Sequence, residues 1–243
     1  MYDLIICVYC CDTVTKYKNE LLKMISVYSS IIKKLPNIKI LYFLGEEEVL
    51  KGDDFIHLKN VKNDYRSATF KQWYGLKYIY ENYNTKFVSC IGTDTYTNIP
   101  KLVSLLYNYD YNKNLYIGGH GCHRTIQNER IYFHSGGPGF IISNKCLEII
   151  YPYLNNIDDF FNNWKDSCGD SHLIDACDVH MGYLATYIKS EIIKVDGFYH
   201  CNYNGYPCCV SKFTYDKIIS CHSMSSDDFD NFTKILQINN YFM

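Results

Sequence analysis

Residues 86–96 read KFVSCIGTDTY, and this stretch decides the fold class. Its first six residues form an apolar run with the length of a buried strand. A polar turn, Gly92-Thr93-Asp94-Thr95, follows at once, and a helical pattern of apolar residues begins at Ile99. A buried strand that ends in a polar turn before a helix is the repeating unit of parallel sheets covered by helices.

The chain before this stretch repeats the same unit. Apolar runs of strand length occupy residues 3–10 and 38–44, and a shorter one, FIHL, occupies 55–58. Apolar residues at helical spacing cover 17–35, where Pro36 ends the pattern, and 68–83. The sequence therefore predicts an α/β fold with a mostly parallel central sheet flanked by helices.

The second half of the 243-residue chain is less regular. It has a Gly/His turn at 118–123, a glycine-rich turn at 135–139 and a helix through Tyr153, followed by an acidic loop. Its other expected elements are strands at 130–134, 140–143 and 217–222 and a helix around 173–189. Since no repeat, low-complexity stretch or linker divides the chain, we expect one domain over residues 1–243.

Composition excludes several classes of function. The net charge is −2 and the sequence has no cluster of Lys or Arg, so it gives no sign of the basic surface that binds nucleic-acid phosphates. No apolar run approaches the roughly 18–20 residues of a membrane helix. The N-terminus has neither a basic start nor a cleavage site and is expected to be a strand. We expect a soluble chain without a membrane span, cytoplasmic by default. The 12 cysteines are expected to be mostly buried, with any pairing open.

Asp94 lies where ligands bind in folds of this class, beyond the carboxyl end of a strand. A carboxylate there can hold a divalent cation against the oxygens of a departing diphosphate. The same residue type is more often a plain turn residue or a helix N-cap, so Asp94 alone is weak evidence for a cation site.

Four segments, in order along the chain, resemble the inverting β-1,3-glycosyltransferase family that includes Fringe and the core 1 β-1,3-galactosyltransferase. They are FVSCIGTDTY at 87–96, YFHSGGPGFIIS at 132–143, CDVHMG at 177–182, and NYNGYPCC at 202–209 with IISCH at 218–222. The first resembles the strand and triple-aspartate turn of the family, and the second resembles its Ser-Gly-Gly-Ala-Gly strand.

The resemblance implies a GT-A-like, Rossmann-like domain that transfers a sugar from a nucleotide-sugar donor, UDP-sugar by likeness, to a glycan or glycoprotein acceptor. It implies inversion and a β-1,3 linkage. Asp94 and His222 match the ligands of Mn²⁺ or Mg²⁺, and Asp178 matches the general base. We expect Asp178 to be exposed, with a pKa near its usual value. Residues 1–96 would form the nucleotide-sugar half and residues 97–243 the acceptor and catalytic half.

The resemblance also assigns residues around the donor and acceptor. Donor binding falls to Thr93 and Asp94 together with two cations at the start of the second helix, Arg66 and Lys71, although a solvated helix face explains the cations equally well. The pocket for the sugar or acceptor falls to Ser135, Gly136, Gly137 and Gly139. The missing β-carbons of the three glycines would admit a ligand, although an ordinary tight turn explains them as well.

Departures from the family keep alternatives open. Gly92-Thr93-Asp94 retains one of the three aspartates, Cys177 replaces an acid, and the family's membrane anchor and stem have no counterpart. A catalytically inactive, sugar-binding relative is therefore the main alternative. A zinc module around His120, Cys122 and His123 lacks paired ligand spacing. A Cys/His hydrolase lacks a cysteine on a strand-to-helix elbow.

Overall fold

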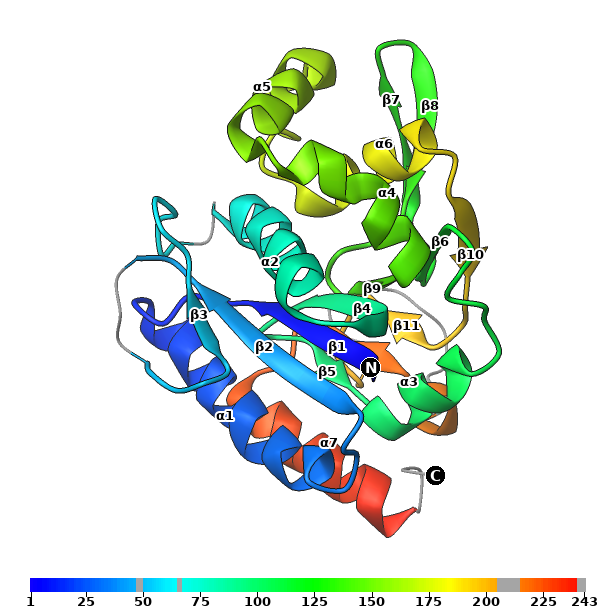
Figure 1. Ribbon diagram of the computed structural model, residues 1–243. Helices are drawn as coiled ribbons and strands as arrows, with labels where there is room; N and C mark the ends of the chain where they lie inside the picture. Colours follow the sequence, from blue (N-terminus) through cyan, green and yellow to red (C-terminus); the bar gives the residue numbers. More distant parts are fainter. Residues whose placement is uncertain (47–49, 65–66, 205–214, 240–243) are drawn as a thin grey trace.

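The computed structural model describes residues 1–46, 50–64, 67–204 and 215–239 (Figure 1). Its central sheet has seven strands in the order β10-β6-β9-β4-β1-β2-β3. All neighbouring strands run parallel except that β9 is antiparallel to both β4 and β6. The strands are β1 (Tyr2–Tyr9), β2 (Ile38–Leu44), β3 (Phe55–His57), β4 (Thr85–Gly92), β6 (Leu115–Gly118), β9 (Phe140–Ser143) and β10 (Glu191–Lys194). The predicted fold class, a mostly parallel sheet flanked by helices, is confirmed.

Helices cover both faces of this sheet because the side chains of β1 alternate between two cores. Leu4, Ile6 and Val8 pack with α1 (Thr15–Ile32), α3 (Ile99–Leu106) and α7 (Ser226–Ile238). Ile5 and Cys7 face the opposite core, which includes α2 (Ala68–Asn82), α4 (Asn144–Leu154) and α6 (Cys177–Tyr187). In Figure 1, α1 and α7 lie side by side, in agreement with their contacts.

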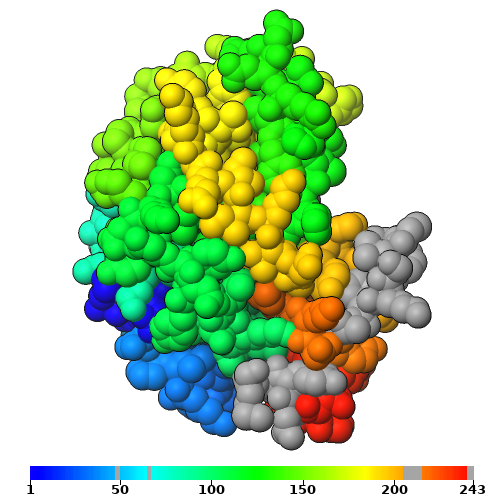
Figure 2. Space-filling view, turned by 90° about the vertical axis from the view of Figure 1, so that its right-hand side faces the viewer, coloured from blue at the N-terminus to red at the C-terminus, as the bar shows by residue number. Residues whose placement is uncertain are grey.

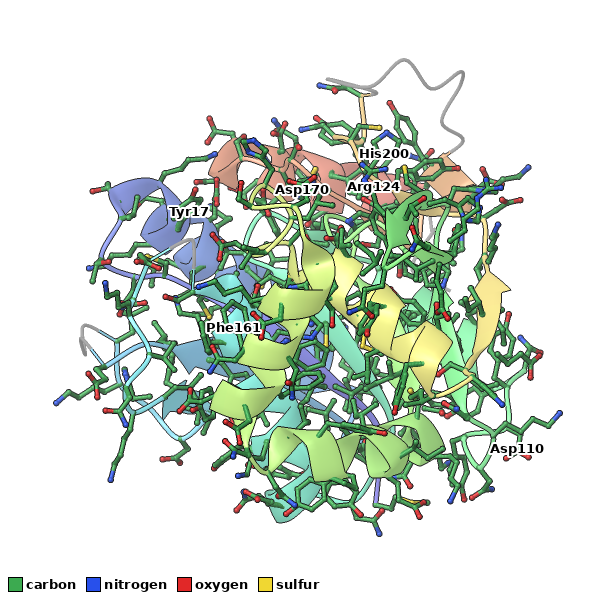
Figure 3. All side chains as sticks on the ribbon, turned by 90° about the horizontal axis from the view of Figure 1, so that it is seen from above. Tyr17, Asp110, Arg124, Phe161, Asp170 and His200 are labelled. Atoms are coloured by element: carbon green, nitrogen blue, oxygen red, sulfur yellow. The ribbon has the colours of Figure 1, made fainter. Side chains whose placement is uncertain are left out.

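A third, smaller core joins the hairpin of β7 (Cys122–Ile126) and β8 (Glu129–Phe133) to α5 (Ile157–Cys168) and the start of α6. Figure 2 shows the hairpin, in green, as a projection at one end of the molecule above the yellow segment that contains β10. Seen from above, Tyr17 and Asp170 lie toward one side of the molecule and Asp110 lies at the other (Figure 3).

A second sheet brings the end of the chain next to the turn after β4. Its order is β11-β12-β5, with β11 (Phe198–Tyr199), β12 (Ser220–Cys221) and β5 (Tyr96–Thr97). Cys221 pairs with Tyr96 in antiparallel register, and the amide of Met224 donates to the carbonyl of Asp94 at 3.0 Å. Residues flanking these pairs, Asp94 and His222, are thereby brought together.

Several predicted elements differ from the observed ones. The segment expected as an acidic loop after Tyr153 is α5, because Asn156 caps it, Asp158 and Asp159 suit its first turn, and Gly169 ends it in the left-handed region. The strand expected at 217–222 shrinks to Ser220–Cys221 because a 3₁₀ turn precedes it. The helix expected around 173–189 begins only at Cys177.

Several elements were not predicted, among them the strands β6, β7 and β10 and the helix α7. The sequence of α7 carries its own start signal, a capping box in which Ser225 and Asp228 satisfy each other's backbone amides. Among the described residues, no helix combines the length and the apolar composition that crossing a membrane requires.

Candidate active site

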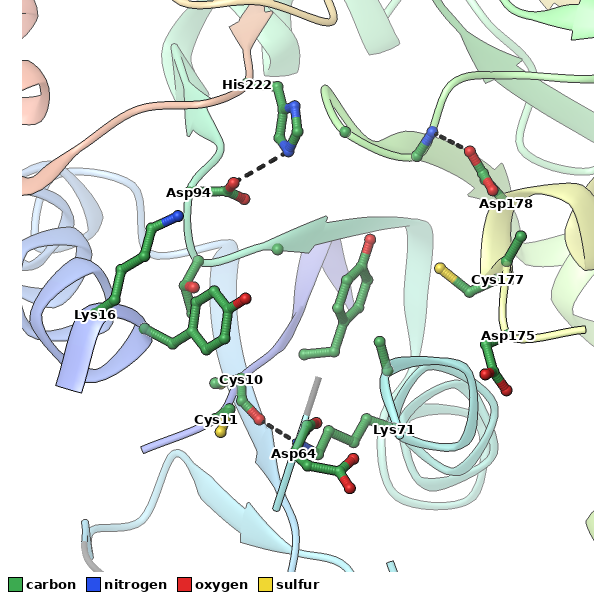
Figure 4. A pocket seen from close by; sticks show the side chains of 18 residues that line it. Cys10, Cys11, Lys16, Asp64, Lys71, Asp94, Asp175, Cys177, Asp178 and His222 are labelled. Carbon is green, nitrogen blue, oxygen red and sulfur yellow. Dashed lines mark hydrogen bonds and ion pairs between the residues drawn. The ribbon is translucent and has the colours of Figure 1, made fainter. Parts of the chain in front are cut away.

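A pocket of about 630 Å³ opens beyond the carboxyl ends of β1 and β4 (Figure 4). Parallel sheets place their ligand crevices at this edge. Seven segments line the pocket: the end of β1, the start of α1, residues around the start of α2, the turn after β4, the glycine turn before β9, the start of α6 and the residue after β12. Their side chains include Tyr9, Lys16, Tyr17, Asp64, Lys71, Thr93, Asp94, Gly136, Gly137, Asp175, Cys177, Asp178 and His222.

Asp94 and His222 form a pair on one wall of this pocket. The Oδ2 atom of Asp94 lies 3.1 Å from Nε2 of His222, and each side chain is less than one-third exposed. The other ring nitrogen, Nδ1, lies 3.2 Å from the hydroxyl of Ser223. Burial on its own lowers the pKa of His222, but the hydrogen bond and charge of Asp94 outweigh it and raise that pKa above its ordinary value.

The donor set of this pair suits a divalent cation. One carboxylate oxygen and one imidazole nitrogen face each other at the pocket, and both are ligands that Mn²⁺ accepts. Histidines that bind metals usually donate their second nitrogen to a neighbour, as Nδ1 can to Ser223. Residues 1–46, 50–64, 67–204 and 215–239 contain no group of three or more His, Cys, Asp or Glu that could hold a metal. The described protein therefore offers two ligands and leaves the rest of a coordination shell to ligand and water.

The glycine turn packs against the side chains on both walls. A β-carbon on Gly136 would lie 2.9 Å from Cβ of Asp178, and one on Gly137 would lie 2.6 Å from Nδ1 of His222. The turn is itself fixed, since the hydroxyl of Thr95 donates to the carbonyl of Gly137 at 2.6 Å. These two glycines line the pocket, and they leave room for the two side chains they touch.

Asp178 lies across the pocket from Asp94 and His222 (Figure 4). Its Oδ2 accepts the amide of Gly136 at 2.8 Å, and its Oδ1 accepts the amide of Val179 at 2.9 Å. The residue belongs to the first turn of α6. Burial raises its pKa above the ordinary value, although both amides oppose that shift. The expectation of an exposed carboxylate with an ordinary pKa was therefore wrong, because Asp178 is half-buried beneath the glycine turn.

Lys71 is one of the two cations that were expected to bind the donor. Lys71 is buried, and its Nζ donates to the carbonyls of Cys10 and Asp64 at 2.7 and 3.0 Å and to Oδ1 of Asn63 at 3.4 Å. Burial lowers its pKa. Because an ammonium has three protons, these acceptors occupy all of them, and Lys71 ties the end of β1 to the loop before α2.

The remaining predicted residues divide into three groups. Thr93, expected to bind the donor, lines the pocket. Ser135 and Gly139 do not; Gly139 has φ +83° and packs against Ile91 and the carbonyl of Cys90. Its glycine is required by the backbone rather than by a ligand. Arg66 lies outside the described residues, as does 205–209 of the segment that resembles the late family motif.

Sequence reasoning missed two charged residues at the start of α1. The side chain of Lys16 is 70% exposed, lines the pocket and reaches toward Asp94 in Figure 4. Glu20, one turn later, is only 3% exposed. Burial and the charge of Asp94 raise its pKa to about 7. Their i,i+4 spacing was a visible signal, but it is equally typical of any solvated helix face.

The residues of the alternative zinc site lie elsewhere. His120 pairs with Asp196 at 3.3 Å, while Cys122 and His123 are exposed on β7. Most of the nine cysteines found as free thiols among the described residues are buried, in keeping with use as small apolar side chains.

A model of the Fringe-like family matches residues 3–242. The chain belongs to the Fringe-like family. The resemblance drawn from four sequence segments is thereby confirmed. A search of curated proteins by sequence finds no match for this Fringe-like chain.

Solved structures similar to this Fringe-like chain are glycosyltransferases. A glycosyltransferase involved in the glycosylation of the major capsid of PBCV-1 aligns with TM-score 0.53 and 14% identity over 96% of this chain and 99% of that one. The galactosyltransferase LgtC aligns with TM-score 0.50 and 10% identity over 96% and 95%. The apo form of GlyE from Streptococcus pneumoniae TIGR4 aligns with TM-score 0.56 and 13% identity over 100% of this chain and 63% of that one. At these identities the structures establish the GT-A fold, and the family and the fold together indicate a glycosyltransferase.

Proposed function

We propose that this chain transfers a sugar from a UDP-sugar to an acceptor hydroxyl, with inversion at the anomeric carbon and with the aid of a divalent cation, Mn²⁺ or Mg²⁺. The observation that supports the proposal is the arrangement of one pocket. The Asp94–His222 pair lies on one wall, and Asp178 lies on the other.

The donor side of the pocket supplies groups for a diphosphate. Asp94 and His222 would hold the cation, which when bound neutralises the negative charge of the departing diphosphate. Lys16 reaches into the same side with its ammonium largely in solvent, so it can pair with a phosphate oxygen. Lys71 keeps the end of β1 in place beneath them.

The acceptor side rests on Asp178. Its carboxylate would take the proton of the acceptor hydroxyl as that oxygen attacks the anomeric carbon from the face opposite the diphosphate. One base across the pocket from one leaving-group site is the geometry of a single in-line displacement, which inverts the configuration. The amides of Gly136 and Val179 fix the orientation of the carboxylate. The β-1,3 linkage and a glycan or glycoprotein acceptor are proposed from the family resemblance.

The decisive experiment measures UDP release from a panel of UDP-sugars with Mn²⁺, with and without candidate sugar acceptors. Asp178→Asn should lose the acceptor-dependent release, whereas Asp175→Asn, on the same wall, should retain it. If wild-type protein binds UDP-sugars by thermal shift but both variants and wild type share one background rate, the chain is a sugar-binding relative without turnover.

A further inference from the structure

Glu20 is a buried acid that the proposed reaction does not use. It lies in the second turn of α1, behind the turn that carries Asp94, and its side chain is 4% exposed. Charged side chains are seldom buried to this degree without a close partner of opposite charge. The partner available here, Lys16, is 3.9 Å away and mostly in solvent.

The other neighbour of Glu20 belongs to the cation site itself. The hydroxyl of Thr93 donates to Oε2 of Glu20 at 3.5 Å, and Thr93 directly precedes Asp94. The charge of Asp94 is one cause of the raised pKa of Glu20. Through Thr93, Glu20 adjoins the Asp94–His222 pair, so three distant parts of the chain bring two carboxyl groups and one imidazole to one wall of the pocket.

The turn after β4 alone provides less negative charge beside His222 than the turn and Glu20 provide together. Gly92-Thr93-Asp94 contributes a single carboxylate. We propose that Glu20 supplies the second negative charge of the cation site, from α1 instead of from the turn. This inference rests on the proposed function, since it assumes a cation between Asp94 and His222.

The charge acts without direct coordination. Within the part of the chain that the structure describes, no three acidic, histidine or cysteine side chains are close enough to share a metal. Glu20 therefore stabilises the cation through the field of its carboxylate and through Thr93, as outer partners of metal sites do. Removing such partners typically weakens metal binding about 10- to 100-fold.

The test measures Mn²⁺ affinity directly, by the electron paramagnetic resonance signal of free Mn²⁺, on the full chain with UDP at about pH 8, above the raised pKa of Glu20. Glu20→Gln keeps the shape and an oxygen that can accept from Thr93, but removes the charge. Glu20→Ala removes both. Glu81→Gln, on an exposed part of α2, is the control.

The proposal expects both Glu20 variants to bind Mn²⁺ about tenfold more weakly or worse, with the control unchanged. If Glu20→Gln binds as wild type and only Glu20→Ala is weak, Glu20 merely positions the turn and the proposal is overturned. Thermal unfolding separates this from misfolding, since a neutral amide suits a buried site and Glu20→Gln should melt no lower than wild type. If wild-type protein binds no Mn²⁺ with UDP, the cation of the proposed function is contradicted as well.

Discussion

Substituting alanine for Gly137 should uncouple His222 from the cation site while leaving the fold intact. The backbone of Gly137 is not in the left-handed region, so alanine brings no conformational penalty of its own. Its new β-carbon, however, would lie 2.6 Å from Nδ1, 2.7 Å from Cγ and 3.0 Å from Cε1 of His222. Ordinary contact begins near 3.4 Å, so the ring must withdraw by about 0.8 Å.

That displacement exceeds what a metal site tolerates. Metal–ligand distances hold within about 0.2 Å of their preferred values. A ring moved several times that far no longer bonds, which removes one of the two protein ligands. We expect Gly137→Ala to bind Mn²⁺ at least about tenfold more weakly in the presence of UDP, since even the loss of an outer partner has that effect. The assay is titration of Mn²⁺ followed by electron paramagnetic resonance.

Gly136→Ala is the matched control for this prediction. Its β-carbon would meet Asp178 instead, at 2.9 Å from Cβ and 3.2 Å from Oδ2. It should therefore reduce turnover and leave Mn²⁺ affinity near that of wild type. Wild-type Mn²⁺ affinity in folded Gly137→Ala, or an equal loss in both variants, refutes the reasoning.

Three other predictions follow from the same contacts. Because burial raises the pKa of Asp178, its carboxyl group stays protonated, and so inactive as a base, up to a higher pH than that of an ordinary aspartate. The transfer rate should therefore fall as the pH drops through that raised pKa. A rate that stays flat down to about pH 4 excludes Asp178 as the base. Lys16→Met should raise the KM for the UDP-sugar several-fold while kcat changes little, in steady-state assays at two salt concentrations, and an unchanged KM removes Lys16 from the donor site. Gly139→Ala should lower the free energy of unfolding in urea by roughly 1–3 kcal/mol, because φ is +83° and the new β-carbon would lie 2.5 Å from Ile91; stability equal to wild type contradicts the close packing described there.

The sequence was most informative where one local pattern determined the element. The apolar run at 38–44 is β2 to the residue, since six of its seven residues are buried and Gly45 follows it directly. The amphipathic segment 157–168 was taken for a loop because its acids and asparagines outweigh its apolar positions, yet Trp164 and Ile157 bury one helical face. Strands as short as β12 depend on their pairing with β5 and leave almost no pattern of their own.

The site residues also divide into those that the sequence indicates and those that only the fold reveals. Asp178 and His222 were assigned by resemblance, because no local rule relates residues so far apart in the chain, whereas Asp94 was also indicated by its place at the end of a strand. Lys71 looked like a donor ligand by position, whereas the fold surrounds it with three acceptors. Lys16 and Glu20 could not be recognised, since only the packing of α1 beside the turn after β4 turns a common i,i+4 pair into part of a pocket.

The most direct test of the account is a crystal structure of the protein with Mn²⁺ and UDP, with anomalous diffraction recorded at the manganese edge. We expect a single anomalous peak bonded to Oδ2 of Asp94 and Nε2 of His222 and to the diphosphate. A complex in which UDP occupies the pocket while manganese is absent from this pair, or is bound elsewhere, would contradict it.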